Sequence, residues 1–554
     1  MPNQPTPTNE PAAQPQPFYY LDNFQQALDW LRERYADLLD TGERAFIEQF
    51  GQLPRPSRAL LVRLIMRKGP HFRAAQLRYP EIGDIDQAAQ PLLAHGWLCA
   101  AQPLDAEQLG QLLRKDELIA LLPPATGLRT LRKPELLERL CALNTGPRPF
   151  RQWCPDSSEQ LLSVLVGELC ERLRLMFFGN LSQGWEEFVL AQLGILRYES
   201  VPLTRESRGF SCRADLQLYQ HLHNCRSLLE QGQPVADILQ LLGEPRCDNP
   251  WLHSRHARLL FQLARQLERE AAPEAALQLY QRSGWKGARQ RQIRILEKLQ
   301  QHAQAHSLVE AALQAPEDDA ELQLALRAQR RLARRLGYLP QSVTAEPDNR
   351  RIDLSLPGPH PLGVEHAVGE HLASAQAPVH YVENTLVTGL FGLLCWEAIF
   401  APVPGAFFHP FHSAPADLHS PDFHSRRHAL FAACLARLDS GDYQQHIRRT
   451  WQAKQGIQTP FVNWAVLSEE LLDQALHCLP AAHLRLWFQR LLLDLRGNRA
   501  GMPDLIQFWP AERRYRMIEV KGPGDRLQDN QRRWLAFCAR HGMPVEVCYV
   551  SWAP

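Results

Sequence analysis

The stretch GMPDLIQFWPAERRYRMIEVKGP, residues 501–523, decides the fold of the C-terminal part of the chain. Two apolar runs are joined by the polar turn PAERR, which predicts an antiparallel strand pair. Because side chains alternate along a strand, Glu519 and Lys521 share one face, and the apolar residues between them enter the core. Asp504 begins the first strand, so we expect Asp504 and Glu519 to converge at one end of the pair.

Two convergent carboxylates repel each other, which favours a bound cation between them. Oxygen ligands select a hard ion such as Mg²⁺ or Mn²⁺, and the carbonyl of Val520 could complete the inner shell. Lys521 is close enough to position an attacking water or to neutralise a phosphate oxygen, as metal-assisted phosphodiester hydrolysis requires. The alternative is a surface hairpin in which Glu519 and Lys521 form an exposed ion pair of little energetic worth.

The residues that follow extend the domain and make it basic. The segment KGPGDRLQDNQRRWLAFCARHG predicts a helix that begins near Asp529 and stops at Gly542, and PVEVCYVSW predicts a further strand. Between Arg485 and Arg540 there are twelve Lys and Arg against six Asp and Glu, two of which are the proposed ligands. This part of the chain therefore has the local positive charge that a phosphate polymer requires.

The composition of the whole chain is balanced. With 61 Lys and Arg against 60 Asp and Glu in 554 residues, the protein is not a polycation, so any basic surface is local. The twelve cysteines contain no C-x-x-C pair and are interpreted as buried thiols of a reducing cytoplasm. The sequence shows neither a signal peptide nor a transmembrane run, which predicts a cytoplasmic protein without membrane partners.

The length and the change in pattern along the chain predict several domains. Apolar residues recur at helical spacing from Phe18 to about residue 340, and PEAALQLYQRS and AQAHSLVEAALQAP lie about thirty residues apart, as in a degenerate solenoid of tetratricopeptide (TPR) type. Strands are expected only after the Pro/Gly break LPGPHPLGVEH. We expect a disordered tail over 1–17, a helical DNA-binding domain over 18–100, a SAP-like helical domain over 101–180, a TPR-like solenoid over 181–355 and a nuclease domain over 356–554.

Two basic groups in the helical part have an ordinary structural alternative. The segment DELIALLPPATGLRTLRKPELLERLCAL resembles a SAP module, a small helical DNA-binding unit, but it also suits a plain helical hairpin with solvated charges. Arg67 and Lys68, beside a Gly-Pro pair, could hold phosphates or belong to a hydrated loop.

A histidine-rich segment, FFHPFHSAPADLHSPDFHSRRH, suggests zinc or iron at first sight. The spacing of its five histidines is irregular and the stretch is rich in proline. We interpret it as a loop that leads into a helix.

The segments GMPDLIQFW, IEVKGPGDRLQDNQRRWL and GMPVEVCYV resemble the VRR-NUC form of the PD-(D/E)xK nuclease fold found in Fanconi-associated nucleases. Three segments upstream, MRKGPHFRAAQLRYPEI, RLMFFGNLSQGWEEFVLAQLGI and YVENTLVTGLFGLLCWEAIF, are similar to that family in the same order. The resemblance implies a multidomain protein with mostly α-helical N-terminal and solenoid modules, followed by a C-terminal α/β PD-(D/E)xK nuclease domain. The ubiquitin-binding zinc finger of animal members has no counterpart here.

The resemblance also assigns the active site. It places metal ligands on Asp504, Glu519, the carbonyl of Val520 and Glu383, and the catalytic lysine on Lys521, with two Mg²⁺ or Mn²⁺ ions. The residues alone do not rank Glu383 above Glu397, which follows on roughly the same face of the helix.

A basic pocket for a 5′-terminal phosphate is implied as well. It falls on Arg496 and Arg499, just ahead of the Pro-Asp pair, and on Arg289 from the solenoid. Arg526, Arg67 and Lys68 are expected as further DNA contacts. A histidine that animal members use in this pocket has no clear match.

The function implied is that of a metal-dependent, structure-selective DNA nuclease, a 5′ flap endonuclease and 5′-3′ exonuclease in interstrand crosslink repair. Its partner would be DNA with a 5′ flap, branch or nick and a 5′-phosphate, bound by a monomer. A junction-resolving endonuclease, which would need a symmetric dimer, and a DNA-binding scaffold without catalysis are the alternatives.

Overall fold

The computed structural model describes residues 17–143, 146–185, 196–337 and 350–553. The chain divides into two compact units, residues 1–196 and 197–554. Of the expected tail over 1–17, all but the last residue lies outside the described ranges. None of the described helices is long and apolar enough to cross a membrane.

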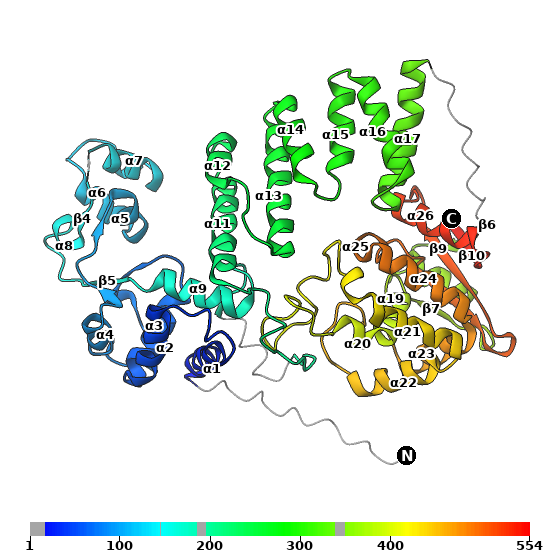
Figure 1. Cartoon of the computed structure of the whole chain (residues 1–554), viewed down its shortest axis with the longest axis horizontal. Helices are drawn as coiled ribbons and strands as arrows, with labels where there is room; N and C mark the ends of the chain where they lie inside the picture. The colour runs from blue at the N-terminus through cyan, green and yellow to red at the C-terminus, as the bar shows by residue number, and fades with distance from the viewer. Residues whose placement is uncertain (1–16, 144–145, 186–195, 338–349, 554) are drawn as a thin grey trace, which may run out of the picture. The chain divides into compact units, whose positions relative to one another are not determined.

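The first unit is mainly helical (Figure 1). Its helices are α1 (Tyr19–Arg34), α2 (Thr41–Gln52), α3 (Arg55–Ile65), α4 (Ile85–Ala94), α5 (Ala106–Leu112), α6 (Lys115–Leu121), α7 (Lys133–Leu143), α8 (Phe150–Trp153) and α9 (Gly167–Phe178), with 3-10 turns η1 (Ala74–Gln76) and η2 (Leu128–Thr130). Its strands are β1 (His71–Arg73), β2 (Leu98–Cys99), β3 (Pro103–Leu104), β4 (Arg148–Pro149) and β5 (Leu161–Val164).

Two expectations about this unit are wrong. Strands occur well before the Pro/Gly break, because β1, β5 and β2 form one small sheet and β3 and β4 another. The SAP-like domain does not extend to residue 180, since β5 pairs with β1 and β2 and α9 packs on α1, where the rings of Trp30 and Phe177 lie 5.2 Å apart. Residues 161–178 therefore belong to the N-terminal domain and not to the SAP-like domain.

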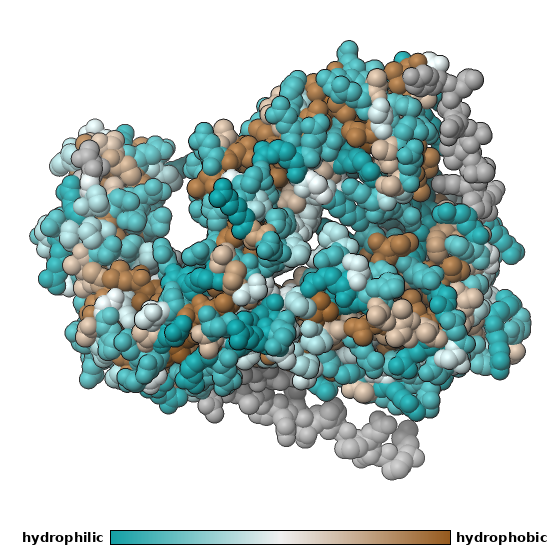
Figure 2. All heavy atoms as spheres, in the orientation of Figure 1, coloured by the Kyte–Doolittle hydropathy of each residue, from teal (hydrophilic) through white to brown (hydrophobic). Residues whose placement is uncertain are grey.

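The second unit begins with a row of helices, each packed against the next (Figure 1). They are α11 (Arg213–Glu230), α12 (Val235–Leu242), α13 (Pro250–Arg269), α14 (Pro273–Ser283), α15 (Ala288–Lys298), α16 (His302–Gln314) and α17 (Asp319–Leu336). The amphipathic helices bury their apolar stripes between neighbours, and Figure 2 shows hydrophilic side chains interspersed with hydrophobic ones on their surface. The predicted helical solenoid is confirmed.

The C-terminal part is a five-stranded sheet enclosed by helices. Its strands are β6 (Arg350–Pro357), β7 (Val379–Tyr381), β8 (Leu505–Trp509), β9 (Arg514–Lys521) and β10 (Val545–Ala553), with the 3-10 turn η5 (Pro510–Glu512) between β8 and β9. Its helices are α18 (Val364–Leu372), α19 (Leu386–Leu394), α20 (Trp396–Ile399), η4 (Ser425–Arg427), α21 (His428–Ser440), α22 (Tyr443–Lys454), α23 (Glu469–Cys478), α24 (Ala481–Leu493), α25 (Leu495–Asn498) and α26 (Asp529–Arg540).

The strand order is β6-β10-β9-β8-β7. The expected hairpin is confirmed, since β8 and β9 are antiparallel with Leu505 opposite Ile518. β10 runs parallel to both β9 and β6. The expected border at residues 355 and 356 is wrong, because it falls within β6, which belongs to this sheet.

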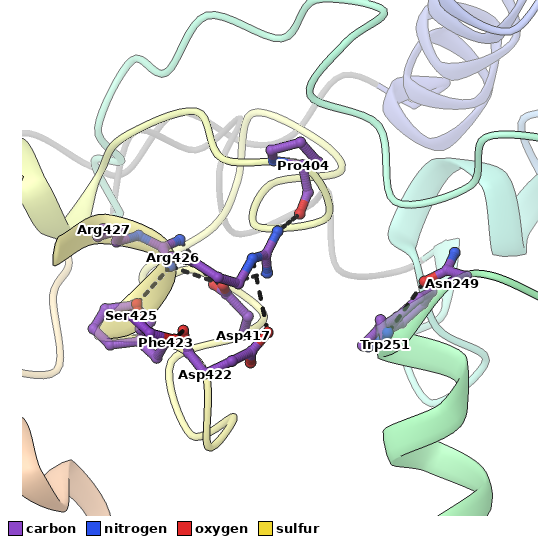
Figure 3. Close-up of polar contacts among 9 residues, drawn as sticks. All are labelled: Asn249, Trp251, Pro404, Asp417, Asp422, Phe423, Ser425, Arg426 and Arg427. Atoms are coloured by element: carbon purple, nitrogen blue, oxygen red, sulfur yellow. Dashed lines mark hydrogen bonds and ion pairs between the residues drawn. The ribbon is translucent and has the colours of Figure 1, made fainter. Parts of the chain in front are cut away.

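The histidine-rich segment lies in the loop between α20 and α21, which a buried ion pair holds together (Figure 3). Asp417 accepts hydrogen bonds from both terminal nitrogens of Arg427, at 2.8 and 2.9 Å, and one from Arg426 at 2.8 Å. His409 and His412 pack ring against ring, and each accepts a backbone N–H bond. Burial lowers the pKa of His412 to about 4, so these two rings are neutral members of the core at neutral pH.

Candidate active site

Asp504 and Glu519 meet where the β8–β9 hairpin opens. The strand pairing ends at Leu505, and beyond it the N–H of Val520 donates to Oδ2 of Asp504 at 2.8 Å instead of to a backbone carbonyl. On the other side of the same residue, the carbonyl of Asp504 accepts from the N–H of Val382 at 2.8 Å. Asp504 is thereby fixed from both neighbouring strands, with only one of its carboxylate oxygens engaged by the Val520 bond.

Glu519 is completely buried, with 0 % of its surface exposed, and Lys521 is 8 % exposed. The surface-hairpin alternative is therefore wrong, because helices cover the face of β9 that was expected to be open. Lys521 Nζ lies 2.6 Å from Oε1 of Glu519. Within the described residues, neither oxygen of Glu519 accepts a hydrogen bond of acceptable geometry. A buried carboxylate that has only one ammonium beside it is costly unless another cation approaches it.

The electrostatics of the site oppose full ionisation. Burial, together with the charges of Asp504 and Glu383, raises the pKa of Glu519 to about 8, although Lys521 opposes this shift. Burial likewise raises the pKa of Asp504 to about 6. A divalent cation would reverse both shifts, because it stabilises the ionised form of each carboxylate.

Glu383 belongs to the same electrostatic group. It follows β7 and precedes α19, and its charge acts on both Asp504 and Glu519. Glu397 is exposed on α20, where its charge acts on Cys434 and His446 instead. The structure therefore separates two glutamates that the sequence alone did not rank.

Glu365 is a further carboxylate that sequence reasoning missed. It lies in the first turn of α18, and its charge raises the pKa of Asp504. A methyl group at Gly522, directly after Lys521, would lie 3.7 Å from Val364, so this turn abuts the end of β9. No sequence motif marks Glu365, which lies in an ordinary amphipathic helix. It comes close to the site only because α18 packs on the sheet.

The donor set fits a hard divalent cation. Asp504, Glu519 and the carbonyl of Val520 are oxygen donors at one strand end, and the orphaned oxygens of Glu519 are the observation that favours an ion there. No three Asp, Glu, His or Cys side chains in the described ranges are already assembled as a complete metal cluster. Glu383 would have to join Asp504 and Glu519 when ions bind.

The expected phosphate-binding arginines differ in their surroundings. Arg496, on α25, is exposed and has neither an ion pair nor a hydrogen bond within the described residues. Arg499 packs on the ring of Phe461 and donates to the carbonyl of Pro460, and burial lowers its pKa. Arg289 is engaged by Glu321 in a two-pronged ion pair.

Arg258 of the solenoid lies near Arg496. Burial lowers the pKa of Arg258 on α13, and the charges of Arg226 and Arg496 add to this effect. Arg255, one turn earlier, stacks on Tyr219 at 4.2 Å and donates to its hydroxyl at 2.8 Å. A bound anion would relieve the repulsion between Arg258 and Arg496.

A cavity of about 460 Å³ adjoins Arg496, with Trp285, Lys286 and His419 in its wall. Sequence reasoning missed these solenoid residues because they lie more than 200 positions before Arg496. Arg526 is exposed in the turn after β9, and Arg67 and Lys68 are exposed in the first unit. Their roles in DNA binding stay predictions.

Comparison with known proteins identifies three family domains in the chain. Residues 438–552 match the VRR-NUC domain, residues 18–99 the FAN1 HTH domain, and residues 103–153 the Fanconi anemia-associated nuclease SAP domain. The chain is 56 % identical over 550 residues to a Fanconi-associated nuclease 1 homolog of Pseudomonas aeruginosa, which covers 99 % of this chain and 98 % of the relative. The homolog of Arabidopsis thaliana is 26 % identical over 96 % of this chain and 67 % of its own length.

A solved structure is similar along the whole chain. It is a crystal structure of paFAN1 bound to 2-nucleotide 5′ flap DNA with a gap, with a TM-score of 0.87 and 55 % sequence identity. The match covers 98 % of this chain and 100 % of that chain.

Proposed function

Because the chain belongs to the Fanconi-associated nuclease family, and is thus a hydrolase of DNA phosphodiester bonds, we propose that it cuts DNA near 5′ flaps. The observation that carries this proposal is the pair of buried carboxylates, Asp504 and Glu519, beside Lys521. We further propose 5′-3′ exonuclease activity and a role in interstrand crosslink repair. The relative of known structure was crystallised with a 5′ flap, which supports the substrate class.

Members of this nuclease family depend on divalent metal. We propose two Mg²⁺ or Mn²⁺ ions held by Asp504, Glu519, the carbonyl of Val520 and Glu383. When bound, such ions polarise a phosphodiester and lower the pKa of water. The protein's own contribution is to hold Asp504 through Val520 N–H, to exclude bulk water from Glu519, and to offer an ammonium at Lys521.

Lys521 has two tasks in this proposal. Its ammonium favours the ionised form of Glu519, which a hard cation requires. It also carries N–H donors that can bind a phosphate oxygen or orient an attacking water at the same site.

The 5′ end is proposed to be read by the arginines around Arg496. Arg258 and Arg496 repel each other, so a terminal phosphate with up to two negative charges relieves that repulsion. Such a pocket would set the distance from the 5′ end to the cut. Arg499 and Arg289 are proposed as supporting contacts.

The test is cleavage by the full chain in Mn²⁺ of matched substrates: a 5′ flap, a nicked duplex, a four-way junction and a single strand. We expect the 5′-phosphorylated flap to be cut fastest, at a position fixed by its 5′ end. Faster cutting of the junction, together with symmetric dimers on DNA, would support a resolvase instead. Absence of cleavage on every substrate would overturn the proposed substrate class.

A further inference from the structure

The carboxylate of Glu383 accepts hydrogen bonds from two residues that are close to it in sequence. The hydroxyl of Tyr381 donates to Oε2 at 2.6 Å, and the side-chain amide of Asn384 donates to Oε1 at 3.0 Å. Each oxygen of Glu383 therefore has one donor and retains room for a second interaction. Ligating carboxylates in metal sites are oriented by outer hydrogen bonds of this kind.

Asn384 also ties Glu383 to the strand that carries Asp504. Its Oδ1 accepts from the N–H of Met502 at 3.1 Å, two residues before Asp504. Its backbone has a φ of 54°, in the left-handed region that Asn tolerates better than most residues. The same side chain thus contacts two chain segments that are 118 residues apart in sequence.

Tyr381 is fixed from outside the site. It ends β7, whose register against β8 places it opposite Leu505, next to Asp504. Its ring stacks on His366 of α18 at 5.7 Å, and 44 % of its surface is exposed. The strand pairing of its backbone and the stacking of its ring together fix the position of the Tyr381 hydroxyl. The hydrogen bond from this hydroxyl then restricts the conformations of the Glu383 side chain.

We infer that Tyr381 and Asn384 are positioning residues that orient Glu383 toward Asp504 and Glu519 for ion binding. The inference rests on the proposed metal-dependent site. Without these donors, the Glu383 side chain must be ordered by the ion itself, at a cost in binding free energy. Neither residue touches the reacting atoms in this assignment.

The test uses full-length protein with Tyr381→Phe and Asn384→Gly, and measures two quantities: the Kd for Mn²⁺ without DNA, by calorimetry, and the Mn²⁺ concentration for half-maximal cleavage. We expect both quantities to rise about tenfold in each variant, with smaller change in the rate at saturating Mn²⁺. Gly tolerates the left-handed backbone at position 384, so Asn384→Gly removes both side-chain bonds without backbone strain. DNA affinity in EDTA should be unchanged.

Asn384→Asp separates the two bonds of Asn384. It retains an acceptor for Met502 N–H and the tolerance for positive φ, but loses the donor to Glu383. We expect Asn384→Asp to be as defective in Mn²⁺ binding as Asn384→Gly. Wild-type Mn²⁺ binding in Asn384→Asp would show that only the link to Met502 matters and would overturn the assignment of Asn384.

Tyr280→Phe is the matched control, because it also removes a tyrosine hydroxyl bonded to a glutamate, Glu268, at 3.0 Å, but in the solenoid. It should leave the Mn²⁺ dependence unchanged. In a Glu383→Gln background, Tyr381→Phe should add no further loss of Mn²⁺ binding, as expected for residues that act through Glu383.

The outcomes distinguish this inference from the proposed function. Tighter Mn²⁺ binding in Tyr381→Phe would mean that the hydroxyl competes with the ion, and unchanged binding would mean that it has no part; either overturns the inference. If Glu383→Gln itself binds Mn²⁺ and cleaves as wild type does, the proposed ligand set fails first.

Discussion

Two buried carboxylates in the same unit have opposite surroundings. Asp417, in the loop between α20 and α21, is 3 % exposed and accepts three hydrogen bonds from Arg426 and Arg427. Glu519 is 0 % exposed, yet it faces the like charge of Asp504 and has only the ammonium of Lys521 beside it. The first arrangement is complete within the protein, whereas the second becomes favourable when a cation is supplied. Burial alone therefore does not identify a functional carboxylate, but incomplete neutralisation does.

The largest expected effect comes from removing the incomplete site. Asp504→Ala, Glu519→Ala or Lys521→Ala should reduce cleavage by at least about 10³-fold, because each removes a proposed metal ligand or the ammonium proposed to serve the chemical step. DNA affinity in EDTA should stay within a few-fold, since it depends on the basic surface. Single-turnover cleavage and metal-free binding assays measure both, and retained cleavage by Asp504→Ala would contradict the assignment.

Breaking the ion pair of Asp417 and Arg427 should lower stability and leave cleavage intact, which is the opposite of the effect expected in the active site. Arg427→Met removes a buried cation from Asp417 and should destabilise the second unit by about 3 kcal/mol, the low end for a broken buried pair, because Arg426 remains. The folded variant should still cut DNA. Denaturant unfolding of the full chain measures the loss, with the surface variant Arg437→Met as control. A catalytic defect without loss of stability would contradict the distinction between the two regions.

Glu383 sharpens the comparison within the site. Glu383→Gln should lower cleavage about 100-fold and weaken the binding of one ion, whereas Glu397→Gln should keep the rate within about tenfold. Mn²⁺ titration of cleavage by the two variants decides between them. If Glu397→Gln is inactive and Glu383→Gln is active, the proposed ligand set is wrong.

A smaller effect on cleavage is expected from Arg258 and Arg496, the proposed contacts of the 5′-phosphate. Replacing both Arg258 and Arg496 with Ala should slow cutting of 5′-phosphorylated flaps about tenfold more than cutting of 5′-hydroxyl flaps. Arg282→Ala is the control, because Arg282 is a surface arginine of the solenoid already paired with Glu244. Equal slowing on both substrates would reduce Arg258 and Arg496 to general backbone contacts.

The smallest effect concerns stability against pH. The pKa of Glu519 is raised by folding from its ordinary value of 4.5 to about 8, so the folded protein binds this proton more tightly than the unfolded chain. Stability in EDTA should therefore fall as pH rises from about 4.5 to about 8 and then level off. Glu519→Gln should remove the part of this fall above about pH 6, where Asp504 no longer titrates, and raise the melting temperature at pH 8 by a few degrees.

Mn²⁺ should raise the melting temperature of the wild type at pH 8, as Glu519→Gln does in EDTA, because the ion neutralises the buried charge. It should have little effect on the melting temperature of Glu519→Gln. Scanning calorimetry with and without Mn²⁺ measures both. A wild type that melts at one temperature across this pH range in EDTA would contradict the account of Glu519.

The fold was largely predictable where local patterns suffice. Alternation and a polar turn predicted β8 and β9, and helical spacing predicted the solenoid. The domain borders were less predictable, because β5 and β6 pair with strands far away in sequence. Short strands such as β1 and β2 have no sequence pattern of their own, since two or three residues cannot show a period.

The sequence by itself determined which groups the site contains: Asp504 at the start of a strand, and Glu519 and Lys521 on one face of the next. Strand alternation is a local property, so it survives in any tertiary setting. Only the tertiary structure decided that Glu519 is buried with Lys521 as its one cationic neighbour in the described residues, that Glu365 acts on Asp504, and that Arg258 lies near Arg496. Burial and electrostatic interaction depend on distances between segments up to 238 residues apart, and such distances are set by how helices and strands pack against one another.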